Sequence, residues 1–167
     1  MSKRTLFACV VFAGFLALVQ VLSAATPSLT GSWQFTLTAT APPTPPVVPI
    51  PGLATFTSDG SVIETDGSEF ALTASATAAP AKTSTPGHGI WQMANTPETL
   101  YVQYISLVLD TDGALYARRV TTMFLTMNAA GNMFSGTYTT DQVTGSVTTL
   151  LSSGTVTGQL IPHVALP

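Results

Sequence analysis

Apolar and polar residues alternate along much of the chain after residue 30. In the segment GSWQFTLTAT, the apolar residues Trp33, Phe35 and Leu37 alternate with glutamine and threonine. A period of two is typical of a strand that buries one face. The rest of the chain is rich in threonine, valine, leucine, alanine and glycine, a composition that favours strands. No later stretch has the spacing of an amphipathic helix, so we predict an all-β domain.

Turn sequences divide this domain into hairpins. SDG separates GLATFT from SVIET, DTDG separates YVQYISLVLD from ALYARRVTTMFLTM, and NAAGN precedes MFSGTYTT. Asp-Gly and Gly-Asn supply the positive φ that tight hairpins need. We also expect SSG to join SVTTLL to TVTGQLI. Eight to nine short strands in sequential hairpins predict an antiparallel up-and-down β-barrel of about eight strands rather than a sandwich.

A proline-rich segment, APPTPPVVPIP at 41–51, interrupts the alternation. Proline cannot donate to a central strand, so this segment is expected to be an extended surface loop. Two roles stay open for it: a lid over the barrel mouth, or a solvated connection.

The first 25 residues have the pattern of a secretory signal peptide. Lys3 and Arg4 precede an apolar run, and Ser23 and Ala25 form a small-residue exit. The run approaches the length of a short membrane span, but the exit favours cleavage. We therefore expect a signal helix at 1–25, a single domain at 26–167 and a secreted protein, extracellular or periplasmic.

The charge and composition of the chain limit the classes of partner that it could bind. The chain has a net charge of −3, and the segment after Ala25 keeps all eight acids but only three cations, which leaves −5. A mildly acidic chain without a basic cluster argues against nucleic acid or an anionic membrane as a partner. The single cysteine lies in the signal segment, so the domain must fold without disulfides.

The segment Gly31-Ser32-Trp33, on the first expected strand, resembles the G-x-W motif of lipocalins and related calycins. LATFTSDGSVIETDG, PGHGIW and the later hairpins are similar to secreted bacterial lipocalin-like barrels, and the resemblance covers most of residues 30–161. It implies a barrel with an interior ligand cavity, closed at one end by Trp33. The chain departs from the family in having no T-D-Y segment and no arginine on its last strand.

Arg118 and Arg119 are adjacent on one expected strand, so one of them should point inward. A buried cation needs a partner. The resemblance implies that this arginine packs across Trp33 by a cation–π contact. The other interpretation is that it binds an anionic group of a ligand.

His88 lies between two glycines in TPGHGIWQ. Glycines permit a sharp turn, so His88 is expected at a corner near the barrel rim. A catalytic histidine also needs a nucleophile and an orienting group, and neither is evident, so no catalytic residue is assigned. His163 falls in the C-terminal tail.

Metal and cofactor sites are not expected. Two distant histidines cannot make a zinc site. DTDG lacks the downstream glutamate of a calcium loop, so it is interpreted as a turn. Glu64, Asp66 and Glu69 are interpreted as a solvated turn.

These patterns predict a secreted barrel that binds a small apolar or amphipathic molecule. Two alternatives stay open: an enzyme that uses the cavity for cyclisation or isomerisation, as allene oxide cyclase-like barrels do, and a structural or surface-interaction barrel whose interior is filled. A cavity separates the first two from the filled barrel, and a buried carboxylate or His88 in that cavity would favour the enzyme. The candidate ligand contacts are Trp33, His88, Trp91, Tyr101, Tyr104, Tyr116, Arg118 and Arg119.

Overall fold

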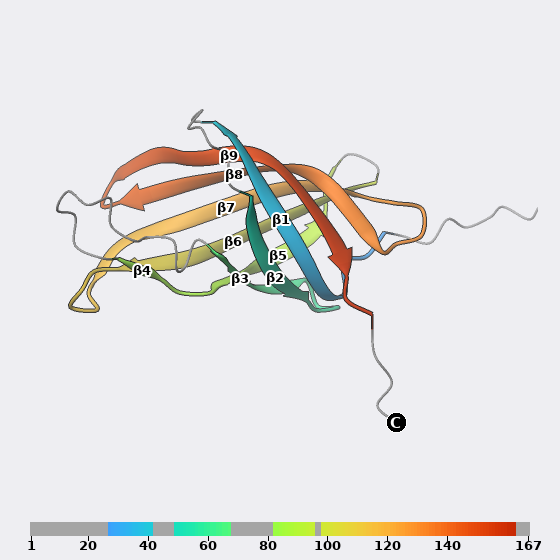
Figure 1. Cartoon of the computed structure of the whole chain (residues 1–167), viewed down its shortest axis with the longest axis horizontal. Coiled ribbons are helices and arrows are strands. Elements are labelled where there is room, and N and C mark those ends of the chain that lie inside the picture. The colour runs from blue at the N-terminus through green and yellow to red at the C-terminus, as the bar shows by residue number, and fades with distance from the viewer. Residues whose placement is uncertain (1–26, 42–48, 68–81, 96–97, 163–167) are drawn as a thin grey trace, which may run out of the picture.

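The protein is a closed antiparallel β-barrel (Figure 1). Its computed structural model describes residues 27–41, 49–67, 82–95 and 98–162. The strands are β1 (Gly31–Ala41), β2 (Ile50–Phe56), β3 (Ser61–Asp66), β4 (Thr83–Ser84), β5 (Gly87–Met93), β6 (Thr99–Leu109), β7 (Leu115–Met127), β8 (Met133–Thr144) and β9 (Val147–Leu160). The predicted signal segment 1–25 lies outside the described residues, as does most of the proline-rich segment 41–51.

The strands follow one another around the barrel in chain order. β4 and β5 both pair with β6, so together they occupy one position in the wall. β9 pairs with β1 and closes the sheet, which gives eight positions. The predicted up-and-down barrel of about eight strands is therefore confirmed. None of the described residues forms a helix long and apolar enough to cross a bilayer.

Three of the predicted hairpins are confirmed, at SDG, DTDG and NAAGN. Each turn contains a glycine with positive φ: 89° at Gly60, 80° at Gly113 and 68° at Gly131. In DTDG, the Asp110 carboxylate accepts hydrogen bonds from the backbone N–H groups of Asp112 and Ala114 at 3.0 and 2.8 Å. The segment therefore forms a turn, as expected, and the Asp110 carboxylate stabilises it.

The fourth predicted hairpin is wrong. β9 runs without a break through SSG, and the turn between β8 and β9 contains Gly145, with a φ of 60°. Gly154 serves a different purpose, because a Cβ there would lie only 2.0 Å from the backbone carbonyl oxygen of Thr38 on β1. The glycine marks a close approach of two strands, which a sequence pattern cannot distinguish from a turn.

The apolar side chains fill one half of the barrel. Trp33 is buried, its ring packs 5.1 Å from that of Phe134, and its indole N–H donates to the Leu29 backbone carbonyl at 2.6 Å. Further layers of this core come from β1, β2, β3, β6, β7, β8 and β9: Phe35, Leu37, Ala54, Phe56, Val62, Leu100, Val102, Met123, Leu125, Tyr138 and Val156. This half is solid, and the interior becomes polar beyond it.

Candidate functional site: a polar cavity inside the barrel

A row of hydroxyl groups marks the end of the apolar core. Tyr104, Thr121, Thr140 and Ser152 lie directly opposite one another on β6, β7, β8 and β9. The Thr121 and Thr140 hydroxyls are hydrogen-bonded at 2.9 Å, and Ser152 bonds the Tyr138 hydroxyl at 2.8 Å. These hydrogen bonds satisfy the hydroxyls of Thr121, Thr140 and Ser152, which with Tyr104 form the floor of a polar chamber.

The next row of residues around the barrel wall contains charged side chains. Glu64 on β3 lies opposite Gly87 on β5, and Ser106 on β6 lies opposite Arg119 on β7. Because His88 pairs with Ile105, its neighbour Gly87 lies opposite Ser106, so all four residues belong to one row around the wall. Glu64 and Arg119 are buried, with exposed fractions of 4% and 8%. Between them stand only a glycine and a serine, which leave open space inside the barrel.

These two rows line a cavity of about 150 Å³. Asp66, half-buried on β3, adds a second carboxylate to its wall. The remaining lining residues combine hydroxyl groups with three aliphatic side chains: Leu37, Ile50, Ser84, Thr85, Tyr138 and Leu151. The cavity can therefore offer both charged and apolar contacts to one small molecule.

The glycines on either side of His88 allow close packing, and Gly87 makes room for the site. A Cβ at Gly87 would lie 2.5 Å from Cδ2 of Tyr104 and 2.6 Å from Oε1 of Glu64. A Cβ at Gly89 would lie 1.9 Å from the backbone carbonyl oxygen of Gln103. Neither glycine has a positive φ. Both residues serve close packing within an extended strand, and no turn occurs here.

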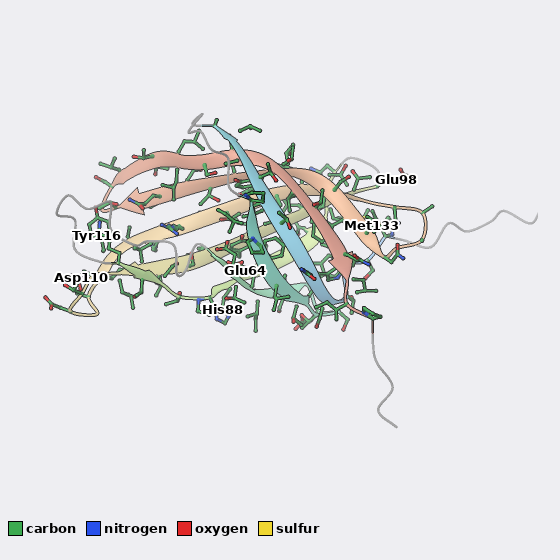
Figure 2. All side chains as sticks on the ribbon, in the orientation of Figure 1. Glu64, His88, Glu98, Asp110, Tyr116 and Met133 are labelled. Carbon is green, nitrogen blue, oxygen red and sulfur yellow. The ribbon has the colours of Figure 1, made fainter. Side chains whose placement is uncertain are left out.

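His88 itself is outside the barrel, so the predicted corner is wrong. It lies within β5, where it pairs with Ile63 and Ile105 and is exposed. Figure 2 shows His88 on the outer face of the wall and Glu64 within the barrel. The alternation of side chains along a strand explains the separation, because the residues on either side of an inward glycine point outward.

The adjacent arginines divide between the two faces, as predicted. Arg119 points inward and lines the cavity, whereas Arg118 is exposed. The predicted packing of an arginine across Trp33 is not found: Trp33 packs on Phe134 in the apolar half, and the cation–π contact in the described part of the chain is that of Lys82, 3.2 Å from the ring centroid of Tyr116. Arg119 is thus part of a charged row rather than a cap on the tryptophan.

The aromatic candidate residues also differ in whether they face the cavity. Tyr104 is buried in the cavity wall, which confirms that one of Tyr101 and Tyr104 faces inward. Trp91 is half-buried, donates to the Thr57 backbone carbonyl at 2.8 Å and packs edge-on against Phe56. Tyr101 pairs with Phe124 with their ring centroids 5.6 Å apart, and Tyr116 is exposed. Of the eight candidate contacts, the cavity is lined by Tyr104 and Arg119; their ligand-binding role stays a prediction.

Burial and nearby charges shift the pKa values of Tyr104 and Arg119. Burial raises the pKa of Tyr104 well above its usual value, and the nearby charges of Glu64 and Asp66 raise it further. Thr121, beside it, offsets part of this shift, but the Tyr104 hydroxyl makes no well-aligned hydrogen bond to the residues that the structure describes. Burial lowers the pKa of Arg119, and Asp66 opposes that change. Tyr104 is therefore a neutral hydroxyl that can donate to a ligand, and Arg119 remains a cation at neutral pH.

Sequence reasoning missed the acidic side of the site. Glu64 and Asp66, predicted in a solvated turn, lie on β3 and line the cavity. Alternation along SVIETD places Val62, Glu64 and Asp66 on one face, but Ile63 on the opposite face is equally apolar. The alternation therefore does not indicate which face of this strand points into the barrel. Glu69 lies outside the described residues.

No family model matches the chain, and no curated protein or solved structure matches it either. The barrel is consistent with the lipocalin-like architecture that Gly31-Ser32-Trp33 suggested. The described residues contain no group of three or more histidine, cysteine, aspartate or glutamate side chains placed to hold a metal ion.

Proposed function

We propose that this protein is a lipocalin-like binding barrel that acts after export and holds one small amphipathic molecule in the polar half of its interior. The observation that carries this proposal is the cavity of about 150 Å³, whose wall combines Arg119, Glu64 and Tyr104 with aliphatic side chains. The exported setting is supported by the signal-like pattern of residues 1–25.

The cavity limits the size of the molecule. An apolar cavity of about 150 Å³ accommodates benzene. A ligand with more than a few additional non-hydrogen atoms would therefore extend beyond the cavity. A long lipid would not fit, because Trp33 and the layers around it fill the other half of the barrel. A barrel solid with side chains, the structural alternative, would leave no such space.

Native mass spectrometry of the protein purified from its producing cells tests this function. A stoichiometric mass that is lost on denaturation would support the proposal. Ser106→Leu should abolish this mass, because Ser106 is buried in the cavity wall. Ser135→Leu is the matched control, because Ser135 is exposed on the outer face of β8. Retention of the bound mass by Ser106→Leu would place the ligand elsewhere.

An enzyme that isomerises or cyclises its ligand is the second candidate. Glu64 favours it, since a buried carboxylate lies in the cavity wall and both Glu64 and Tyr104 lie over Gly87. A carboxylate that takes a proton, next to a neutral hydroxyl that gives one, is an arrangement suited to proton transfer. His88 plays no part in it, because it points outward.

Solvent exchange separates the enzyme from the binder. The molecule recovered from the barrel would be incubated with the protein in deuterated water. An enzyme should place deuterium on carbon of that molecule, and Glu64→Gln should stop this exchange. If the molecule binds but gains no carbon-bound deuterium, the protein is a binder.

A further inference from the structure

The hydroxyl of Tyr104 is a buried polar group without a well-aligned hydrogen bond to the residues that the structure describes. The side chain is only 3% exposed and forms part of the cavity wall. The other hydroxyls of its row are bonded: Thr121 pairs with Thr140 at 2.9 Å, and Ser152 pairs with Tyr138 at 2.8 Å. A buried O–H group without an acceptor is unfavourable, so its place in a cavity wall points to a ligand that supplies the acceptor.

The proton of Tyr104 stays on its oxygen at neutral pH. Burial raises the pKa of Tyr104 well above its usual value, and the charges of Glu64 and Asp66 raise it further. A neutral phenol is a better donor than acceptor, because the ring withdraws electron density from the oxygen. The burial that disfavours a negative charge on this oxygen also disfavours a carboxylate placed against it. The complementary group is therefore a neutral oxygen that accepts a hydrogen bond.

We infer that the bound molecule is a small neutral carbonyl compound, whose oxygen accepts a hydrogen bond from Tyr104 while its apolar body contacts the aliphatic part of the cavity wall. This inference rests on the proposed function and adds the chemical class of the ligand and the residue that selects it. A carbonyl oxygen accepts a hydrogen bond without adding a donor that would need a partner of its own. Leu37, Ile50 and Leu151 supply the aliphatic surface, and the cavity of about 150 Å³ has room for one six-membered ring.

Two probes of nearly the same shape test the inference: cyclohexanone, and methylenecyclohexane, which carries a CH₂ group in place of the oxygen. Titration calorimetry measures the affinity of each probe for the protein freed of bound molecules and for its Tyr104→Phe variant. We expect Tyr104→Phe to weaken the binding of cyclohexanone about tenfold, which corresponds to about 1.4 kcal/mol. The affinity for methylenecyclohexane should change by less than about twofold, because this probe accepts no hydrogen bond. A third probe, cyclohexanecarboxylate, should bind more weakly than cyclohexanone.

A control variant and a spectroscopic signal isolate the Tyr104 hydroxyl. Tyr101→Phe removes a hydroxyl from the outer face of the same strand, where Tyr101 packs against Phe124, and should leave both affinities unchanged. The carbonyl stretching band of bound cyclohexanone should lie at lower wavenumber in the parent protein than in Tyr104→Phe, because a hydrogen bond to the oxygen weakens the C=O bond. This shift reports the contact itself, and a change of packing alone would not produce it.

Stability measurements show whether the Tyr104→Phe variant keeps its fold. The substitution retains the ring and removes a hydroxyl without an acceptor, so the ligand-free variant should unfold at the same urea concentration as the parent protein or at a higher one. Tyr138→Phe should lower the urea midpoint, because it removes the 2.8 Å bond to Ser152. A lower midpoint for Tyr104→Phe than for Tyr138→Phe would overturn the inference, since the Tyr104 hydroxyl would then serve the fold.

The outcomes separate the inference from the proposed function. An equal loss of affinity for cyclohexanone and methylenecyclohexane in Tyr104→Phe, or a carbonyl band that does not shift, overturns the hydrogen bond. Tighter binding of cyclohexanecarboxylate than of cyclohexanone overturns the neutral class. Failure of cyclohexanone to bind also overturns the inference, whereas the proposed function is judged by the native mass and by its loss in Ser106→Leu.

Discussion

Gly87 on β5 lies directly opposite Glu64 on β3, and a methyl group at Gly87 would come within 2.6 Å of the Glu64 carboxylate. The same methyl group would come within 2.5 Å of the Tyr104 ring. The absence of one side chain therefore allows a carboxylate and a tyrosine to share the cavity wall. The glycine is a requirement of the site rather than of a turn.

Gly87→Ala should destabilise the barrel by about 1–3 kcal/mol, the usual cost of adding a methyl group to a packed interior. Urea unfolding measures this loss. Gly67→Ala is the control, because a Cβ there would meet its nearest atom at 3.5 Å and should have little effect. Equal stability of the two variants would show that the wall near Glu64 moves freely.

Replacement of the two adjacent arginines should have different effects. Arg119→Met removes the cation from a buried charged row and leaves its carboxylates without that charge, so we expect a loss of about 2–4 kcal/mol in the free energy of unfolding. Arg118→Met alters an exposed residue and should change stability by less than about 0.5 kcal/mol. Denaturant titration of both variants at neutral pH gives the comparison, and a larger loss for Arg118→Met would contradict the assigned orientation.

Tyr104 should link stability to alkaline pH. Its pKa is raised in the folded protein, whereas in the unfolded chain it ionises near its usual value of about 10. The contribution of Tyr104 is therefore fully present below a pH of about 10 and is lost as the pH rises from there through the folded-state pKa. Alkaline unfolding followed by tyrosinate absorbance should show one of the four tyrosines ionising together with unfolding.

Tyr104→Phe removes this linkage. The variant should keep its stability over a wider alkaline range than the parent protein, while Tyr116→Phe, at an exposed position, should leave the pH dependence unchanged. An identical alkaline profile for Tyr104→Phe would show that another group controls unfolding.

The two tryptophans should differ in their contribution to stability. Trp33→Phe leaves the Leu29 carbonyl without its 2.6 Å hydrogen bond in a buried position and also removes ring volume, so a loss of about 2–4 kcal/mol is expected. Trp91→Phe, half-buried, should cost less. Thermal unfolding ranks the two variants, and the reverse order would contradict the placement of Trp33 in the buried core.

Export can be checked on the protein itself. Cleavage after Ala25 predicts a chain that begins at Thr26, and the mass of the protein recovered from the periplasm or the medium measures this directly. Replacement of Ala25 by a bulky residue should block processing. An intact N-terminus on exported protein would contradict the predicted signal peptide.

The sequence by itself determined the architecture. Alternation in GSWQFTLTAT, together with Asp-Gly and Gly-Asn turns, was enough to predict an up-and-down barrel, because a period of two and a positive φ are local properties of the chain. Alternation also required that Arg118 and Arg119 point to opposite faces. These conclusions depend only on neighbours in sequence.

The tertiary structure alone decided the site. Ile63 and Glu64 are adjacent, and only their burial in the folded barrel shows that the carboxylate is inside and the isoleucine outside. The glycines around His88 and Gly154 have the composition of turns, but each is explained by an atom from a strand distant in sequence. Sequence patterns identify strands because side chains alternate along one strand, whereas a cavity forms from rows that cross many strands, and the pairing that aligns those rows exists only in the folded barrel.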